Sequence, residues 1–189
     1  MEIRTAELER YREEGIEARK KIDVSLITGI SEILYSKLRK GGKLITFGNG
    51  GSAADAQHFA AELSGRFLKE RRSLPAIALT TNTSSITAIG NDYSFSDVFS
   101  RQIDGICAKD DFVVGISTSG NSLNVVNGLK RAKELGAFSL ALTGRKGGKV
   151  SEIADISVRI DSDLTPIIQE IHIAVIHMIC YSLDLLMQE

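Results

Sequence analysis

The stretch KLITFGNGGS, from Lys43 to Ser52, decides the fold class. Its first half is a short apolar run that predicts a strand from Lys43 to Phe47, and its second half is a glycine-rich turn. The preceding pattern is helical and ends at the glycine pair at positions 41 and 42. The hydrophobic period therefore changes from helix to sheet at this point.

The same unit recurs along the rest of the chain. Further strands are predicted at 76–79, 112–116, 140–142 and 156–160, with helical segments between them. Strands that are apolar on both faces and alternate with helices indicate a parallel sheet covered on both sides and joined by right-handed crossovers. The predicted fold class is α/β, a three-layer sandwich with a five-stranded parallel sheet flanked by helices.

The two ends of the chain are predicted to be helical. Apolar residues recur at helical spacing from Ala6 to about Lys40, which favours two N-terminal helices, and Pro166 to Met187 reads as a long closing helix with proline in its first turn. The 189 residues contain no repeat, low-complexity run or flexible linker. We therefore expect one domain over 1–189, with N-terminal helices in 1–40 and an α/β core in 41–189.

Composition excludes several classes of partner. Lys and Arg number 23 against 24 for Asp and Glu, a net charge of -1, so no bulk field attracts nucleic acid or an anionic membrane. Cys107 and Cys180 lack CxxC spacing, and the charged N-terminus lacks the apolar core of a signal peptide. Reduced thiols in a cytoplasmic protein are the expectation.

The most apolar stretch, Ile171 to Leu186, is shorter than the roughly 20 residues that span a bilayer. It is also interrupted by His172, His177 and Asp184. A buried helix is predicted instead, with neither a membrane nor nucleic acid as a partner.

Three polar or glycine-rich loops follow predicted strands, at 48–52, 117–122 and 143–148. Ligands of an open parallel sheet bind beyond the carboxyl ends of its strands, so these loops should share one rim. The loop from Ser117 to Ser122 supplies hydroxyls and amides just before a helix that begins near Leu123, where a phosphate is favoured. Such residues also merely cap helices and turn chains, but two such loops at consecutive strands favour a phosphate pocket.

Two groups of polar side chains are candidates for chemistry. His58 and Glu62 are four residues apart on one helix face and can reach one ion or one substrate atom, although such a pair is usually a minor surface interaction. Gln169, Glu170, His172 and His177 lie on a helix too apolar to be a surface element, so they need buried partners, and a hydrogen-bonded core histidine is the alternative reading.

Helical geometry limits which of these residues can meet. Gln169 and His177 differ by about 80° around the helix axis and about 12 Å along it, so they reach one atom only at full stretch. On composition alone, Asn91 and Asp92 would form an ordinary turn. Asp92 is a candidate functional residue only if it lies at the rim formed by the strand-end loops.

Five runs, taken together and in order, resemble the phosphoheptose isomerases of the SIS (sugar isomerase) superfamily. They are GNGGSAADAQHFAAELSGRF at 48–67, IGNDYSFSDVFSRQ at 89–102, GISTSGNS at 115–122, LTGRKGG at 142–148 and IQEIHIAVIH at 168–177. The resemblance covers nearly the whole chain. One departure is Ile167, where the family usually has an arginine, which bears on sugar preference.

The resemblance implies a cytoplasmic homotetramer with active sites at subunit interfaces. It also implies conversion of sedoheptulose 7-phosphate into D-glycero-D-manno-heptose 7-phosphate for bacterial surface polysaccharide, including lipopolysaccharide. The zinc ligands that it implies are His58, Glu62, Gln169 and His177. The substrate contacts that it implies are Asn49, Gly50, Gly51, Ser52, Glu62, Asn91, Asp92, Ser117, Thr118, Ser119, Ser122 and Gln169.

Aldose–ketose isomerisation moves a proton between two neighbouring carbons through an enediol or enediolate. We expect Glu62 to be the base, His177 its acid/base partner at the oxygens, and Asp92 an aid to ring opening. Zinc would polarise the carbonyl as a Lewis acid, yet a zinc-bound Glu62 or His177 is a poorer proton acceptor. The 12 Å rise between Gln169 and His177 suggests either ligands from more than one subunit or an interrupted helix.

A rival hypothesis is a non-catalytic SIS module that senses a sugar phosphate or binds the replication initiator through the same pocket. A third reading is purely structural, with a helix-capping rim and a satisfied polar core. Glu62 and His177 favour the enzyme, because the non-catalytic relative resembles this chain less at these two positions.

Overall fold

The computed structural model describes residues 2–188. Their strands form one sheet of β1 (Leu44–Gly48), β2 (Ala76–Ala78), β3 (Phe112–Ser117), β4 (Phe138–Gly144) and β5 (Ile156–Ile160). The spatial order is β2-β1-β3-β4-β5, and all neighbouring strands are parallel. The predicted five-stranded parallel α/β architecture is confirmed.

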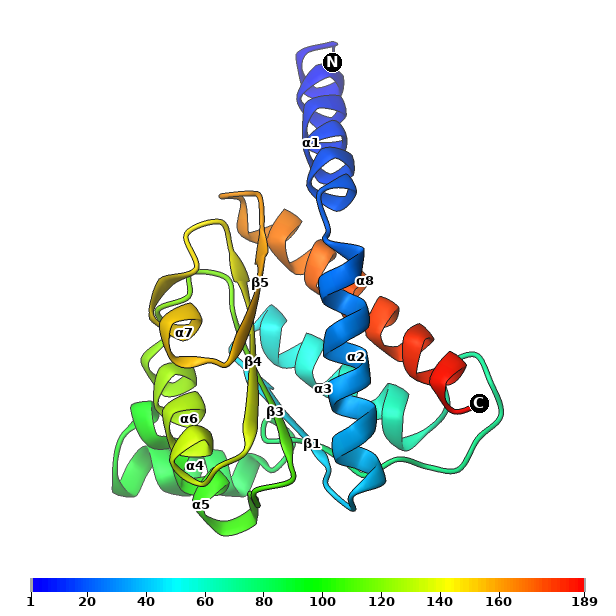
Figure 1. Ribbon diagram of the computed structural model, residues 1–189. Helices are drawn as coiled ribbons and strands as arrows, with labels where there is room; N and C mark the ends of the chain where they lie inside the picture. The colour runs from blue at the N-terminus through cyan, green and yellow to red at the C-terminus, as the bar shows by residue number, and fades with distance from the viewer. Residues whose placement is uncertain (1, 189) are drawn as a thin grey trace.

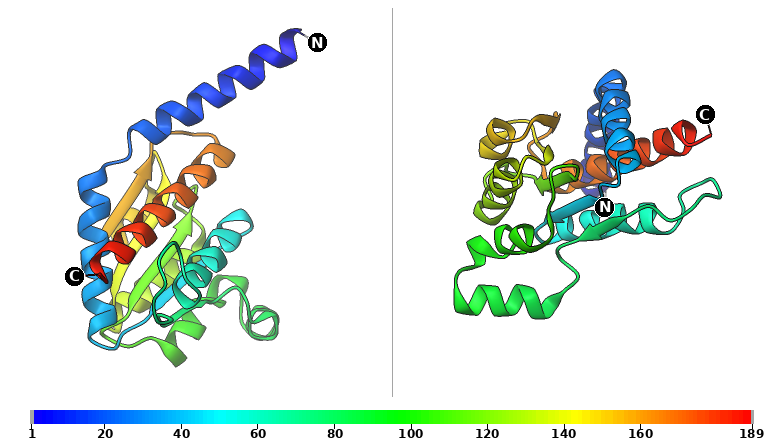
Figure 2. Two further views of the ribbon diagram at one scale, coloured as in Figure 1. Left: turned by 90° about the vertical axis from the view of Figure 1, so that its right-hand side faces the viewer. Right: turned by 60° about the horizontal axis from the view of Figure 1, so that its bottom comes forward.

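Helices cover both faces of the sheet (Figures 1 and 2). One face carries α2 (Val24–Arg39), α3 (Gly51–Ser64) and α8 (Thr165–Leu186). The other carries α4 (Thr83–Asp92), the short 3-10 helix η1 (Phe95–Asp97), α5 (Ser100–Ile106), α6 (Leu123–Glu134) and α7 (Gly148–Ile153). The result is the three-layer sandwich that the alternating pattern predicts.

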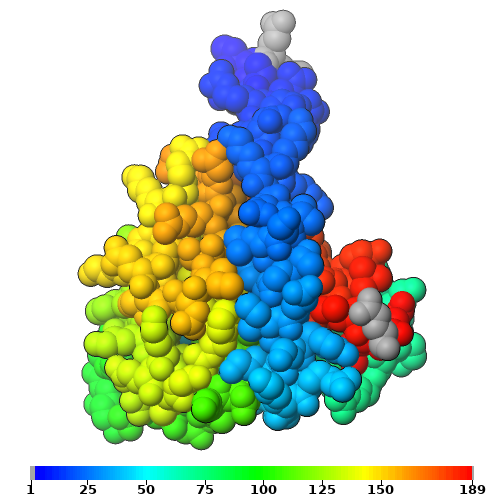
Figure 3. Space-filling model, in the orientation of Figure 1, coloured from blue at the N-terminus to red at the C-terminus, as the bar shows by residue number. Residues whose placement is uncertain are grey.

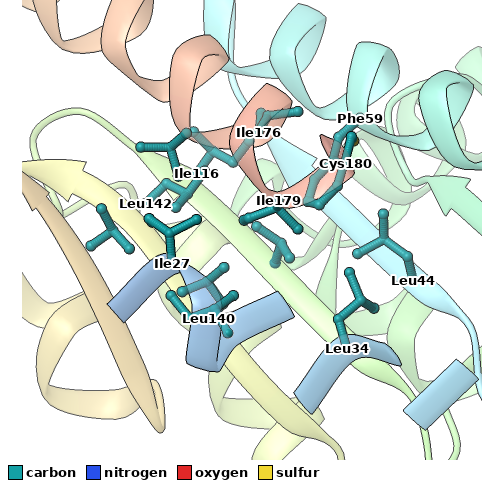
Figure 4. Packing of buried hydrophobic residues seen from close by; sticks show 14 of the residues in the cluster. Ile27, Leu34, Leu44, Phe59, Ile116, Leu140, Leu142, Ile176, Ile179 and Cys180 are labelled. Atoms are coloured by element: carbon teal, nitrogen blue, oxygen red, sulfur yellow. The ribbon is translucent and has the colours of Figure 1, made fainter. Parts of the chain in front are cut away.

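The core has two halves because strand side chains point alternately to the two faces. Leu44 packs with Phe59 and Ile176 in the layer that contains α3 and α8, as Figure 4 shows. Its neighbour Ile45 packs on the other side of the sheet, against the α5 and α6 layer. Since β1 and β3 are buried throughout, they read as continuous apolar runs.

Strand β4 is longer than its apolar run predicts, because two polar residues near its ends are satisfied inside the fold. Ser139 binds Asp155 through both its N–H and its hydroxyl, at 2.8 Å each. The hydroxyl of Thr143 donates to the carbonyl of Gly147 at 3.1 Å. Hydrogen bonds to loop partners thus let the strand continue where apolar side chains end.

The two predicted N-terminal helices are present, as α1 (Glu2–Lys20) and α2. They are separate because Asp23 caps α2, accepting from the N–H of Leu26 at 3.0 Å. Helix α1 stands clear of the body in the space-filling view (Figure 3). Its second half is anchored where the hydroxyl of Tyr11 donates to Glu170 at 2.6 Å, whereas Leu8 is 70% exposed.

Helix α8 is long and apolar enough to cross a membrane by length and composition. In this fold it instead packs against α2, α3 and β4, with Ile171, Val175 and Ile179 buried in the core. The helix runs without interruption from Thr165 to Leu186 and has proline in its first turn. This is the buried closing helix that the sequence predicts.

Candidate active site

Loops at the carboxyl ends of the strands meet at one rim, as predicted. The strand order reverses between β1 and β3, the point at which open α/β sheets bind ligands. Asn49, just after β1, exchanges two side-chain hydrogen bonds of 2.8 and 2.9 Å with Asn124, in the first turn of α6. The loops after β1 and β3 are therefore joined side by side.

The hydroxyl-rich loop after β3 is tightly folded. The hydroxyl of Ser117 donates to that of Ser122 at 3.0 Å, and the N–H of Gly120 donates to the carbonyl of Ser117 at 2.9 Å. The N–H of Gly144, at the end of β4, donates to the carbonyl of Thr118 at 3.0 Å. The third predicted loop thereby lies against the second.

Helix α6 begins directly after this loop and carries no acidic side chain in its first turn. Its first N–H groups and the partial positive charge of its N-terminus favour an anion. Ser119 is exposed and Thr118 is half-buried, so hydroxyls are available to a ligand from solvent. The arrangement suits a phosphate group.

A second centre lies further along α3, where it packs on α8. Nε2 of His58 is 2.9 Å from Nε2 of His177 and 3.2 Å from Oε1 of Glu62. One ligand atom from each of the three side chains lies within 4.8 Å of the others. The spacing of His58 and Glu62 alone is weak evidence for a functional site. In the structure, the two side chains also meet the imidazole of His177 from the final helix.

The surroundings of this cluster lower the pKa of His177, which disfavours the charged form of its imidazole. Burial lowers the pKa of the His177 imidazole, and the neighbouring His58 lowers it further. The ring of Phe67 packs beside it, with ring centroids 5.6 Å apart. An imidazole can accept a proton and give it back, and its neutral form can also ligate a metal.

The other polar residues of α8 have different partners. Gln169 lies against the start of α3, because a Cβ built on Gly51 would fall 2.5 Å from its Nε2. Glu170 accepts the hydrogen bond from Tyr11, and His172 is fully buried, with Nε2 donating to the carbonyl of Thr143 at 3.3 Å. The core-histidine reading therefore applies to His172.

Gln169 lies beside Gly51 at the start of α3, about two turns before His58. It precedes His177 by eight residues of a continuous helix, a rise of about 12 Å. The structure therefore excludes an interrupted helix as the way to bring them together. Two ways to bring them together then remain, which are side chains at full stretch and ligands from more than one copy of the chain.

Asn91 and Asp92 are the last residues of helix α4, so the prediction of a simple turn is wrong. The helix forms because Asn82 caps its start and Ile86 and Ile89 pack against the core. Both Asn91 and Asp92 are exposed, and the amide of Asn91 donates to Asp92 at 2.9 Å. They belong to the helical layer opposite the one that carries His58, Glu62 and His177.

Ile167 is completely buried in the core. The side chain at this position therefore packs against its neighbours and does not face a ligand. Hydrophobic packing therefore accounts for an isoleucine at this position.

Several residues next to the site escape prediction from the sequence. Asn124 bridges the loops, Phe67 packs on His177, and Asp184 on α8 pairs with Arg71. The signal for Asp184 is present in the sequence, since a carboxylate in an apolar helix needs a partner. Nothing in the spacing identifies Arg71 as that partner.

The donor set suits a zinc ion. Two imidazole nitrogens and a carboxylate are ligands that Zn²⁺ prefers, and three protein ligands with an open position are typical of catalytic zinc sites. His58 and Glu62 are partly accessible, with 41% and 20% of their side chains exposed. The three side chains could therefore hold a metal that a substrate can reach.

Comparison with known proteins agrees with the fold. Residues 10–144 match the SIS domain, so the chain belongs to that family of sugar isomerase domains. A probable phosphoheptose isomerase of Thermoplasma acidophilum is 59% identical over 175 residues, covering 93% of this chain and 96% of the relative. The phosphoheptose isomerase of Aliarcobacter butzleri is 56% identical over 154 residues, covering 82% of each.

A solved structure supports the same assignment. The phosphoheptose isomerase GmhA of Neisseria gonorrhoeae superposes with a TM-score of 0.89 at 43% identity, covering 95% of this chain and 98% of that one. Within the SIS domains, the chain belongs to the phosphoheptose isomerase family.

Proposed function

We propose that the protein interconverts sedoheptulose 7-phosphate and D-glycero-D-manno-heptose 7-phosphate. The observation that carries the proposal is the meeting of Glu62 with His58 and His177 at the junction of α3 and α8. A carboxylate and an imidazole at one point are what proton transfer next to a carbonyl requires. The family to which the chain belongs supports this choice of reaction.

In the proposed reaction, the carboxylate of Glu62 removes a proton from C1 of the open-chain ketose and later delivers it to C2. His177 donates a proton to O2 as the enediol forms and takes one from O1 as it collapses. The C1–H bond breaks, the C2–H bond forms, and the carbonyl moves from C2 to C1. Asp92 assists ring opening before these steps.

The phosphate is held by hydroxyls and helix-terminal amides at the rim. Ser117, Thr118, Ser119 and Ser122 provide the hydroxyls, and the first turn of α6 provides N–H groups. The remaining proposed contacts are Asn49, Gly50, Gly51, Ser52, Asn91, Asp92 and Gln169. Gly50 has a φ of +55° and exposes its backbone, which lets a ligand approach closely.

His58, Glu62 and His177 would hold a zinc ion, with Gln169 as a fourth ligand. When bound, zinc supplies Lewis-acid polarisation of the carbonyl oxygen. Since zinc competes with protons for the same lone pairs, Glu62 and His177 serve as ligands and as acid/base groups in different states. His58, which has no other proposed role, is the constant ligand.

Gln169 lies beside the start of α3 and Asp92 in the opposite helical layer, so we place both in sites shared between copies of a homotetramer. An apolar groove beside His177 supports this arrangement, because it leaves large apolar side chains such as Val24, Leu68 and Tyr181 half or more exposed. The protruding half of α1 adds Leu8. Exposed apolar surface of this extent favours subunit contact.

The proposal extends to the whole chain and its setting. Residues 1–189 would form a single SIS domain, with N-terminal helices in 1–40 and the α/β core in 41–189. The enzyme would act in the cytoplasm and supply heptose for surface polysaccharide.

Incubation with sedoheptulose 7-phosphate in D₂O, followed by NMR, tests the proposal. We expect part of the aldose to carry deuterium at C2, because the proton held by the carboxylate exchanges with solvent in some turnovers before its delivery to C2. Activity should fall with a chelator and return with Zn²⁺. Absence of turnover with and without zinc, together with recovery of the replication initiator in a pull-down, would favour the non-catalytic alternative.

A further inference from the structure

A buried ion pair joins the loop after α3 to the last turns of α8. Nε of Arg71 donates to Oδ1 of Asp184 at 3.0 Å, and the two side chains are only 6% and 1% exposed. The loop, residues 65–75, has neither helix nor strand. Groups so deeply buried are retained only where hydrogen bonds satisfy both partners.

On one side of the pair, Arg71 caps α3 in the turn that carries Glu62. Its Nη2 donates to the carbonyl of Glu62 at 2.7 Å, and its Nη1 donates to that of Leu63 at 2.9 Å. The last carbonyls of a helix lack partners within the helix, and a cation is favourable there. The guanidinium therefore fixes the end of α3 at the position of the proposed base.

On the other side, Asp184 fixes the segment that touches His177. Its Oδ2 accepts from the N–H groups of Leu68 and Lys69, both at 2.9 Å, directly after Phe67, whose ring packs on His177. Burial opposes ionisation of Asp184, yet these N–H groups and Arg71 hold its pKa below the usual range. Asp184 also follows His177 by seven residues, two turns along the same helix face.

We propose that Arg71 and Asp184 are positioning residues that set α3 against α8, so that Glu62 and His58 meet His177. Neither side chain touches the reacting atoms. The pair acts through the backbone of Glu62 and through the Phe67 segment. The inference rests on the proposed function in taking this cluster as the reaction centre.

The chain contains a matched control at the other end of the sheet. Asp111 is 2% exposed and accepts from Nζ of Lys43 at 2.6 Å, from the N–H of Lys43 at 2.9 Å and from that of Ala108 at 2.8 Å. Like Asp184, it is a buried carboxylate held by one cation and two backbone N–H groups. It precedes β3, at the amino ends of the strands, away from the rim.

The test compares Asp184→Asn, Arg71→Lys and Asp111→Asn by kcat and KM, at a temperature where circular dichroism shows each to be folded. We expect kcat to fall at least tenfold in Asp184→Asn and Arg71→Lys with KM changed less than twofold, since the substrate's phosphate is held elsewhere. Asp111→Asn should lose stability but keep kcat within twofold. Unchanged kcat in Asp184→Asn, or an equal loss in Asp111→Asn, overturns the proposal.

A second readout needs no turnover. The rings of His58 and His177 lie 5.1 Å apart, close enough for an NMR contact between their protons in metal-free protein. We expect that contact to weaken in Asp184→Asn and to persist in Asp111→Asn. If the contact between His58 and His177 persists in Asp184→Asn, the positioning role is rejected. If the contact is lost in Asp184→Asn but the wild type shows no turnover, the positioning role stands and only the proposed function is rejected.

Discussion

Gly120 lies where two of the rim loops are in close backbone contact, and Gly120→Ala tests how strongly the phosphate loop depends on that contact. A Cβ at this position would lie 1.9 Å from the carbonyl oxygen of Gly147 and 2.6 Å from its carbon. Both are backbone atoms, so no side-chain rotation relieves the overlap. The loop containing Gly147, or the phosphate loop itself, has to move.

The magnitude has two parts. Gly120 has a φ of +71°, and an L-residue in the left-handed region costs about 1 kcal/mol. The steric overlap adds roughly 1–3 kcal/mol, the usual range for forcing extra volume into a packed site. Gly41 is the control, because its φ is +89° but a Cβ there meets nothing within 4 Å. Gly41→Ala should therefore show only the cost of the left-handed backbone conformation, without the steric overlap.

The assay is urea unfolding of both variants, with KM for the sugar phosphate measured alongside. We expect Gly120→Ala to lose about 2–4 kcal/mol of unfolding free energy and Gly41→Ala about 1 kcal/mol. Displacing the loop should also raise KM about tenfold, equivalent to about 1.4 kcal/mol of binding, in Gly120→Ala alone. Equal losses of stability, with KM unchanged in both variants, would refute this reasoning.

Further predictions concern buried ionisable groups. Burial raises the pKa of Asp55 to about 6, and its Oδ2 has no hydrogen-bond partner among residues 2–188. Removing this carboxylate relieves an ionisation penalty of about 3 kcal/mol at pH 7, while a buried amide without a partner costs about 2 kcal/mol. Asp55→Asn should therefore raise the unfolding free energy by about 1 kcal/mol, and a decrease in a denaturant titration would contradict this. Burial lowers the pKa of His172 to about 4, so the unfolded chain binds the proton first as pH falls below about 6.5. The contribution of His172 to the unfolding free energy should therefore fall by about 2 kcal/mol between pH 7 and pH 5. His172→Phe should lack this pH dependence.

Local patterns predict the architecture well because they have direct physical causes. Strands β1 and β3 are buried on both faces, so each appears in the sequence as a continuous apolar run that predicts a buried strand. Prediction falls short where polar residues are satisfied by distant partners. Ser139 extends β4 only because Asp155 meets it, and Asn91 continues α4 where composition favours a turn.

In the candidate site too, some features follow from local sequence patterns and others depend on distant partners. The closeness of Glu62 and His177 follows from a buried helix whose histidine needs a partner, and the structure places the two together. Gln169 precedes His177 by eight residues of a continuous helix, so spacing alone left its place in the cluster open. Arg71 could not be predicted as the partner of Asp184, because the loop that carries it has no regular period from which to infer its direction.

The most direct test of the account is the turnover of sedoheptulose 7-phosphate by wild type, Glu62→Gln, His177→Gln and the double variant. If the carboxylate and the imidazole act on the same substrate carbons, each single variant should lose a factor of order 10² or more in kcat. The double variant should then lose little beyond the worse single one, as residues that act as a unit do. Near-normal rates in either single variant, or losses that multiply in the double variant, would contradict the account.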